Sequence, residues 1–204
     1  MINFKLLEQS YSQSGQESFV VGILDNLLNG FYLEIGAFHS KELSNTFLLE
    51  SCFGWRGLAI EIVKKRSKEY NRNRENLCIR ADATSLDYSM LFLTHNVPHI
   101  IDYLQVDIEP ATNSFTALKS LPFSTNQFRV ITFEHDIYAD TQNLGIQEMA
   151  FVFLQSHGYH RVAKNVKNSG LSYEDWYIHP ELIHKKFTGF SLPSDTEFTD
   201  FFIS

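Results

Sequence analysis

The sequence has little cysteine, no long apolar run and a deficit of positive charge, and each absence excludes a class of protein. Two cysteines, Cys52 and Cys78, cannot cross-link 204 residues, so we expect reduced thiols in the cytoplasm and not a disulfide-dense secreted scaffold. No apolar run approaches the length of a bilayer span, and the first 15 residues lack the features of a signal peptide. With 17 Lys and Arg against 24 Asp and Glu, the net charge of −7 argues against binding to nucleic acid or to an anionic membrane.

The composition that remains is that of a globular domain. Hydrophobic residues make up 44% of the chain and charged residues 20%, which is enough apolar material for a sizeable core. We expect one domain over residues 1–204, with a helical N-terminal segment at 1–28 and a tail at 186–204 that lies over the surface.

Short apolar runs that end in a carboxylate recur along the chain. The runs are residues 31–34, 58–61, 77–82, 103–107 and 130–134, and the acids that end them are Glu34, Glu61, Asp82, Asp107 and Glu134. These acids lie 21–27 residues apart, a spacing that suits one strand and one helix with their turns. The gaps contain stretches with helical spacing, at 16–28, 44–52, 64–72, 112–121 and 145–157. The pattern predicts an open α/β sheet with the acids along one edge, where ligands bind in such sheets.

Two further strands are predicted at 158–162 and 173–178. A polar turn with Asn and Gly at 165–170 separates them, and this connection is too short for a crossover helix. The sheet is therefore predicted to end in an antiparallel pair.

The first predicted strand is followed by a single glycine, Gly36, and not by a glycine-rich loop. The sequence contains neither G-x-G-x-x-G nor a Walker pattern, which disfavours a dinucleotide and excludes P-loop chemistry. S-adenosylmethionine carries no phosphate and requires different partners. It needs close backbone approach at a glycine, acids near its ammonium group and its ribose, and free N–H groups for its carboxylate.

The acids and the first turn meet these needs. The predicted cofactor-binding residues are Glu34, Gly36, Ala37, Asn45, Thr46, Glu61, Ile62, Asp82, Ala83 and Asp107. Among them Glu61 is expected to accept from the ribose hydroxyls, and Asp82 from the adenine amino group. For each acid alone, a solvated strand end or a helix cap is the ordinary alternative.

Eight stretches between residues 12 and 180 also match, in order, the motifs of a known family. They are S-Q-S-G-Q-E at 12–17, F-Y-L-E-I-G-A at 31–37, S-N-T-F-L-L-E at 44–50, G-W-R-G-L-A-I-E at 54–61, I-D-Y-L-Q-V-D-I-E at 101–109, F-R-V-I-T-F-E-H-D at 128–136, A-K-N-V at 163–166 and E-D-W-Y at 174–177. With these motifs the chain resembles the FkbM-type methyltransferases, a branch of the class I S-adenosylmethionine-dependent enzymes. It departs from them at 38–40, where Phe-His-Ser replaces smaller residues, and at Glu109-Pro110, where many members have Glu-Gly.

The resemblance implies a fold and an activity. The implied fold is a Rossmann-like class I methyltransferase sheet of seven strands, mostly parallel, with an antiparallel C-terminal hairpin and helices on both faces. The implied activity is transfer of a methyl group from S-adenosylmethionine to a hydroxyl on a sugar, a glycan or another small molecule.

The acids that follow the fourth and fifth strands resemble a metal site. In metal-dependent class I O-methyltransferases, acids at these strand ends hold a divalent cation that lowers the pKa of the acceptor hydroxyl. By that analogy Asp107 and Glu134, with His135 or Asp136, are predicted to hold Mg²⁺. The predicted catalytic residues are Asp107 and the two candidate bases, Glu109 and His135. A polar strand terminus with capping roles is the alternative.

Other functions stay open at this point. Methylation of a DNA or RNA base is disfavoured because residues 107–110 read Asp-Ile-Glu-Pro, where base methyltransferases usually carry [DN]-P-P-[FYW]. An NAD-dependent oxidoreductase or epimerase on a similar sheet is one alternative, and a degenerate cofactor-binding domain without turnover is another. The sequence does not fix the oligomeric state, and a homodimer is compatible with it.

Overall fold

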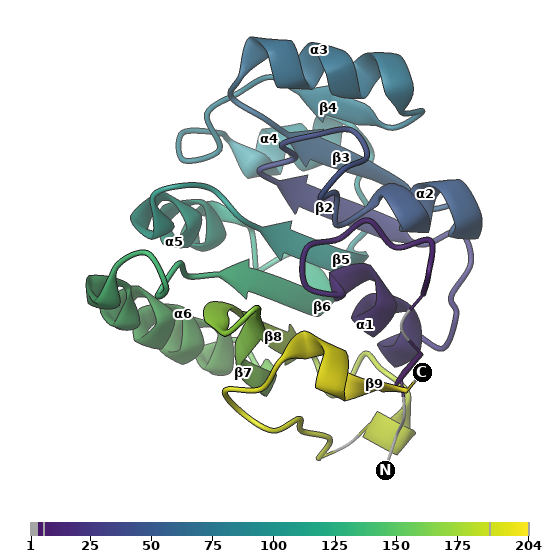
Figure 1. Ribbon diagram of the computed structural model, residues 1–204. Coiled ribbons are helices and arrows are strands. Elements are labelled where there is room, and N and C mark those ends of the chain that lie inside the picture. The colour runs from purple at the N-terminus through teal and green to yellow at the C-terminus, as the bar shows by residue number, and fades with distance from the viewer. Residues whose placement is uncertain (1–3, 6, 188, 204) are drawn as a thin grey trace.

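The computed structural model describes residues 4–5, 7–187 and 189–203, and its centre is a seven-stranded sheet (Figure 1). The strands are β2 (Phe31–Ile35), β3 (Arg56–Ile60), β4 (Leu77–Ile79), β5 (Ile100–Val106), β6 (Gln127–Glu134), β7 (His160–Asn168) and β8 (Leu171–Ile178). Their order is β4-β3-β2-β5-β6-β8-β7, and β8 runs antiparallel to both of its neighbours. This confirms the predicted fold: a mostly parallel, Rossmann-like methyltransferase sheet that ends in an antiparallel hairpin.

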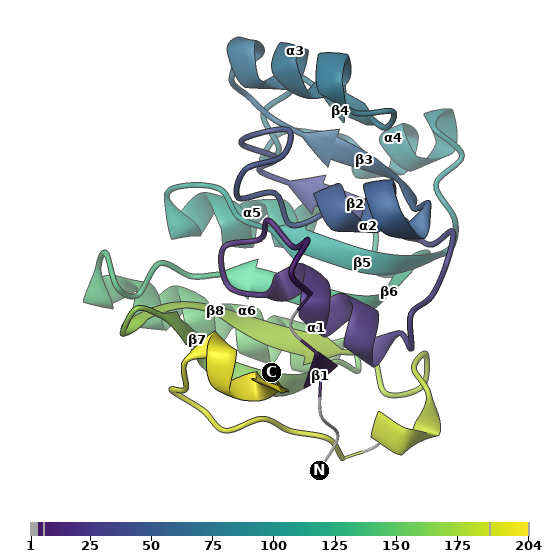
Figure 2. The ribbon, with the colours of Figure 1, turned by 45° about the vertical axis from the view of Figure 1, so that its right-hand side comes forward.

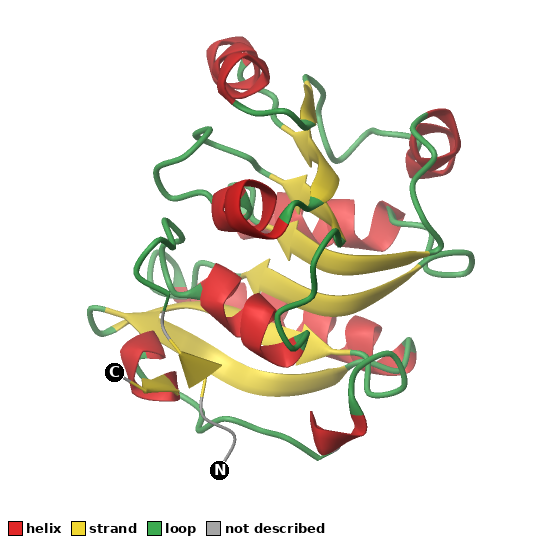
Figure 3. Cartoon of the chain, turned by 90° about the vertical axis from the view of Figure 1, so that its right-hand side faces the viewer, coloured by secondary structure: helices red, strands yellow, loops and turns green. Residues whose placement is uncertain are grey.

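Helices cover both faces of the sheet (Figure 3). They are α1 (Gln16–Ile23), α2 (Phe47–Phe53), α3 (Lys64–Asn73), α4 (Tyr88–Thr94), α5 (Ala111–Ser120) and α6 (Leu144–Ser156). Buried residues of α4, α5 and α6 share one core cluster with the sheet, whereas α1 and α2 belong to a second cluster on the other face (Figure 2). Tyr70 of α3 joins Ala59 and Cys78 in a small third cluster.

Alternation along the strands decides which side chains reach the site. Leu33 and Ile35 pack into the core beneath α4 to α6, so Tyr32 and Glu34 between them point to the face of α1 to α3. Glu34 pairs in register with Gln105, and Gln105 pairs with Thr132. The C-terminal ends of the central strands thus carry buried polar side chains on this second face.

The C-terminal tail contributes to the core. It contains two 3₁₀ turns, Lys185–Phe187 and Phe198–Phe201, and the two-residue strand β9 (Phe202–Ile203), which pairs in parallel with β1 (Phe4–Lys5). Phe187 and Phe201 are buried, and the Phe201 ring lies 5.5 Å from the ring of Trp176. Most of the described tail is exposed or half-buried, as expected of a segment lying over the surface, but these two aromatic residues insert into the core on the face of α1. Residues 188 and 204 of the tail lie outside the described residues.

The helix predictions differ from the structure in two ways: one predicted helix is too long, and one helix was missed. The first helix ends at Ile23 and not at residue 28, because Asp25 and Asn26 adopt positive φ angles of 56° and 59°. Helix α4 was not predicted from the sequence, although Asp87 caps it by accepting from the amide of Met90. Of the predicted N-terminal segment, residues 1–3 and 6 lie outside the described part. Within that part of the chain, no helix has the length and apolar character to cross a membrane.

Candidate functional site

A cavity of about 370 Å³ opens at the C-terminal ends of β2, β3, β5 and β6. Most of its lining residues come from these strand ends and the loops that follow them, with Gln13 from the segment before α1 and Arg66 from α3. They are Gln13, Glu34, Gly36, Phe38, Leu43, Asn45, Glu61, Ile62, Val63, Arg66, Asp107, Ile108, Glu109, Glu134 and Tyr138. The position is the one that the strand-end acids predict, and the volume suits a small ligand or cofactor.

The floor of the cavity is the tight turn at Gly36. The glycine has a φ of +92°, and a Cβ atom there would overlap the backbone carbonyl oxygen of Asp107. The amides of Gly36 and Ala37 donate to the carbonyl of Ile60 at 3.0 and 3.2 Å, and the amide of Asp107 donates to Ile35 at 2.9 Å. Only glycine fits between β2, β3 and β5 here, so the backbone itself forms part of the cavity wall.

Glu34 is a buried acid that faces this cavity. One of its oxygens accepts a hydrogen bond from the Thr46 hydroxyl at 2.8 Å, and the carboxylate also accepts from the amide of Asn45. Burial raises the pKa of the Glu34 carboxyl to about 7. A cation placed in the cavity would favour the ionised form.

Glu61 holds the loops at the other wall. One of its oxygens accepts from the amide of Phe38 at 3.1 Å and the other from the amide of Val63 at 2.6 Å. Each oxygen retains a lone pair, so the carboxylate can still accept from a pair of ligand hydroxyls. Ile62 and Val63 are 60% and 41% exposed and line the cavity beside it, which provides an apolar wall for a flat ring.

Asn45 presents an unused acceptor to the cavity. Its side chain is 6% exposed, and its Oδ1 atom has no hydrogen-bond partner in the structure. Such a group is costly unless a ligand or water supplies the missing donor. The loop around it is fixed from both ends, because Ser44 Oγ accepts from the amide of Phe47 and Glu17 accepts from the amide of Leu48.

Asp107 and Glu134 meet at the end of the cavity nearest β6. They share a hydrogen bond, which requires a proton on one of the two carboxyl groups. Burial raises both pKa values, that of Asp107 to about 6 and that of Glu134 further, because Glu134 also faces Asp107, Glu174 and Asp136. Near neutral pH the two carboxyl groups therefore share one proton, and the pair carries about one negative charge.

Of the predicted Mg²⁺ ligands, the structure brings Asp107 and Glu134 together but places His135 elsewhere. His135 is fully buried, and its Nε2 atom lies 3.4 Å from Asp175 on β8. The cause is alternation: Glu134 faces the cavity, so the next residue along the chain points elsewhere. Among the residues that the structure describes, no three His, Cys, Asp or Glu side chains form a metal-binding group. The prediction of a Mg²⁺ site is therefore not supported.

The remaining predicted residues divide by position. Glu109 is exposed and lines the cavity, whereas Thr46 and Ala37 are buried behind the lining. Asp82 is exposed outside the lining, and its Oδ1 accepts from the amide and hydroxyl of Thr84. Ala83 is buried next to it. The adenine contact of Asp82 and the catalytic role of His135 stay predictions.

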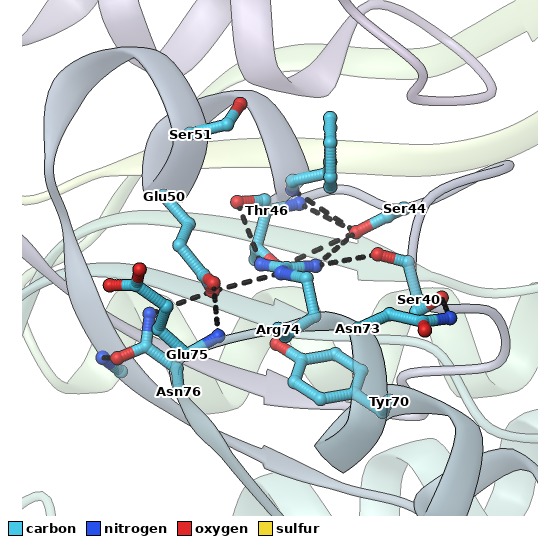
Figure 4. Close-up of polar contacts among 12 residues, drawn as sticks. Ser40, Ser44, Thr46, Glu50, Ser51, Tyr70, Asn73, Arg74, Glu75 and Asn76 are labelled. Carbon is cyan, nitrogen blue, oxygen red and sulfur yellow. Dashed lines mark hydrogen bonds and ion pairs between the residues drawn. The ribbon is translucent and has the colours of Figure 1, made fainter.

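A buried arginine, which sequence reasoning missed, supports the loop over the cavity (Figure 4). Arg74 follows α3 and donates to Glu50 at 2.8 Å, to the Ser40 carbonyl at 3.0 Å and to Ser44 at 3.2 Å. Its third nitrogen donates to the carbonyl and hydroxyl of Thr46, both at 3.1 Å. No local pattern could have found it, because its side-chain partners lie 24–42 residues away in the sequence.

Arg74→Met should lower stability sharply, because it leaves Glu50 and several loop oxygens buried without their donor. Breaking a buried ion pair from one side costs about 3–5 kcal/mol of unfolding free energy. For a chain of this size the melting temperature should fall by about 10 °C. Lys186→Met, which removes an exposed pair with Asp25, is the matched control. Equal melting curves for both variants would show that the Arg74 network contributes no stability.

The sheet order and the strand-end cavity together define the Rossmann-like fold of class I methyltransferases. Solved structures share it at low sequence identity, which concerns the fold alone. The human methyltransferase 10 domain containing protein has a TM-score of 0.52 and 12% identity over 79% of this chain and 78% of its own. A candidate rRNA methylase from Clostridium thermocellum has a TM-score of 0.55 and 11% identity over 85% and 99%.

An O-methyltransferase from Bacillus cereus, solved in complex with SAH, has a TM-score of 0.51 and 15% identity over 85% of this chain and 83% of its own. No protein-family model matches the sequence, and the comparison with curated proteins finds no relative. The resemblance to FkbM-type enzymes therefore stays a prediction.

Several lining residues were not predicted from the sequence. Arg66 and Tyr138 are examples, and both reach the cavity from outside the strands. The Arg66 guanidinium lies 3.9 Å above the ring of Phe38, the residue that replaces a small one in the first turn. The bulky Phe38 side chain was a usable signal for this contact, whereas nothing in the sequence indicates Tyr138.

Proposed function

We propose that this protein is an S-adenosylmethionine-dependent methyltransferase that methylates a hydroxyl group of a small molecule. The observation that carries the proposal is the cavity wall itself. It combines a backbone turn open only to glycine at Gly36, a buried acid at Glu34, an acceptor at Glu61 and the unpartnered oxygen of Asn45. These acceptors, beside an open backbone turn, fit a ligand with an ammonium group, a ribose and no phosphate. The B. cereus structure, solved with SAH on the same fold, supports it.

Each wall of the cavity has a part in holding the cofactor. Glu34 attracts the ammonium group, Asn45 accepts from it, and Glu61 accepts from the ribose hydroxyls. Ile62 and Val63 cover the adenine ring. When bound, S-adenosylmethionine supplies an electrophilic methyl group on its sulfonium.

The Asp107–Glu134 pair supplies the base. Asp107 is the ionised member of the pair near neutral pH, and its pKa of about 6 suits a base working there. Glu134 keeps its proton and holds Asp107 through the shared hydrogen bond. Asp107 takes the proton of the acceptor hydroxyl at its free oxygen, while Glu109 and Tyr138 at the same end of the cavity orient the acceptor.

The charge of the cavity limits the acceptor. Among the described lining residues, the acidic side chains are Glu34, Glu61, Asp107, Glu109 and Glu134, and the one basic side chain is Arg66. A nucleic acid or another polyanion would meet repulsion here, whereas a neutral or cationic hydroxyl compound such as a sugar would not. The exposed ring of Tyr138, whose centroid lies 4.5 Å from that of the tilted Tyr173 ring, offers an apolar face to such a compound.

A direct test is methyl transfer from labelled S-adenosylmethionine to a panel of sugars, glycans, amino alcohols and short RNA. Label in a neutral or cationic hydroxyl compound is the expected result. Label in RNA alone would contradict the proposed acceptor, and cofactor binding without transfer to any acceptor would favour a degenerate domain.

Glu61→Gln should weaken SAH binding about tenfold, because the amide offers one acceptor where the carboxylate offers two and the charged hydrogen bond is lost. Calorimetric titration of SAH measures the change. Asp82→Asn is the control, because Asp82 lies outside the lining and should leave the Kd unchanged. An equal loss in Asp82→Asn would contradict this placement and restore the adenine contact predicted for Asp82.

A further inference from the structure

Among the residues that the structure describes, no cation contacts Glu34 directly, but a hydroxyl group connects it to Arg74. Arg74 donates to Thr46 Oγ1 at 3.1 Å, and Thr46 donates to Glu34 at 2.8 Å. Two buried phenols lie beside this chain. The Tyr32 hydroxyl accepts from Arg74 at 3.1 Å and donates to Glu50 at 3.0 Å, and the Tyr70 hydroxyl lies 2.8 Å from it and 3.4 Å from the same Glu34 oxygen.

A hydroxyl that accepts from a guanidinium becomes a stronger donor, so the positive charge of Arg74 reaches Glu34 through the polarised hydroxyl of Thr46. Thr46 is buried, so water does not screen the effect. Figure 4 shows the Arg74 side chain between Thr46 and Tyr70.

We propose that Arg74 is a positioning residue for the cofactor: through the hydroxyl group of Thr46 it keeps the Glu34 carboxylate ionised and aimed at the cofactor ammonium. The inference rests on the proposed function and adds a residue that lies outside the cavity. Arg74 thus acts through Glu34, and it does not itself contact the cofactor.

The other titratable groups around Glu34 work against ionisation or are neutral. Glu17 of α1 faces it as a second buried acid. Tyr32 of β2, Tyr70 of α3, Tyr103 of β5 and Cys78 of β4 also face Glu34, and all have raised pKa values, so they stay neutral. Glu61 directly follows the neighbouring strand β3, and Glu50 of α2 pairs with Arg74. Arg74 is the cation in this group, and it opposes the effect of burial on the pKa of Glu34.

The test is the pH dependence of SAH affinity. Calorimetric Kd values are measured from pH 6 to 9 for the wild type, Arg74→Gln and Thr46→Val, and each variant is compared with the wild type at the same pH. The quantity compared is the ratio of the variant Kd to the wild-type Kd at one pH. The titration of SAH itself and of Asp107 cancels in this ratio. We expect binding about tenfold weaker for Arg74→Gln at pH 7, recovering to within about twofold at pH 9, where Glu34 ionises without help. Thr46→Val should show the same trend with a smaller loss.

Matched controls separate this effect from general damage. Thr132→Val removes a buried hydroxyl that bonds Tyr103, and Tyr159→Phe removes one that accepts from the amide of Phe128. Neither hydroxyl links Arg74 to Glu34, so neither substitution should change the ratio of variant to wild-type Kd at any pH. If Arg74→Gln fails to fold, Thr46→Val carries the test, because it leaves the other contacts of Arg74 intact.

A second readout does not need the cofactor. Carboxyl ¹³C shifts of labelled glutamate, with the Glu34 signal assigned by Glu34→Gln, report its titration directly. The midpoint should rise by about one pH unit in Arg74→Gln. The inference is overturned if the ratio of the Arg74→Gln Kd to the wild-type Kd does not change with pH, or if the titration midpoint of Glu34 is the same in Arg74→Gln and the wild type. Wild-type protein that binds no SAH at any pH overturns the proposed function instead, while the ¹³C midpoint still judges Arg74.

Discussion

Gly36→Ala should abolish SAH binding while leaving a folded chain with lower stability. The new methyl group would overlap the carbonyl oxygen of Asp107, and the φ of +92° is strained for alanine. Because β2 and β5 are held in register by hydrogen bonds on both sides of this turn, the loop and not the sheet must shift. That shift displaces the wall between Glu34 and Asp107, and we expect at least about a hundredfold loss of affinity, or about 2.7 kcal/mol.

Gly145→Ala is the control for this substitution. Gly145 lies in the first turn of α6, and a Cβ there meets nothing within 4 Å. Alanine in a helix should raise stability by about 0.5–1 kcal/mol and leave SAH binding unchanged. Calorimetry and thermal melts of the two variants measure both effects. A Gly36→Ala protein that binds SAH like the wild type would show that this turn is not part of the cofactor site.

Asp107→Asn should lower kcat by about 10²–10⁴-fold with little change in the Kd of SAH, because the amide cannot take a proton from the acceptor. Asparagine keeps the size of aspartate and can still accept from Glu134, so the local structure should survive. In the wild type, kcat should fall as the pH drops through about 6, because a base acts in its ionised form and Asp107 becomes protonated there.

Glu109→Gln separates the base from a residue that orients the acceptor. Glu109 is exposed at the cavity, so its amide variant should raise the KM for the acceptor more than it lowers kcat. The opposite result is a large loss of kcat in Glu109→Gln together with a nearly unchanged kcat in Asp107→Asn. It would show that the base is Glu109, the other acidic candidate that the sequence predicted.

The repeated strand-end acids made the fold and much of the site predictable. Parallel strands place their C-terminal ends at one edge of the sheet, so Glu34, Glu61, Asp107 and Glu134 had to lie together. The same logic identified Gly36, because a sharp turn after the first strand needs a residue without a Cβ. These predictions required only the register of strands, which local patterns define.

What the sequence could not predict depends on contacts between distant segments. Arg74 reads as one more polar residue after a charged helix, and its burial follows from packing against Glu50 and the loop near Thr46. His135 illustrates the reverse case. It follows a cavity residue directly, yet alternation turns its ring toward Asp175.

The most direct test of the account is calorimetric titration of SAH, and separately of NAD, into the purified chain. We expect SAH to bind, with the affinity lost in Gly36→Ala and reduced in Glu61→Gln, and NAD to show no binding. A folded wild-type protein that binds NAD, or that binds neither ligand, would contradict the assignment of the cavity to S-adenosylmethionine.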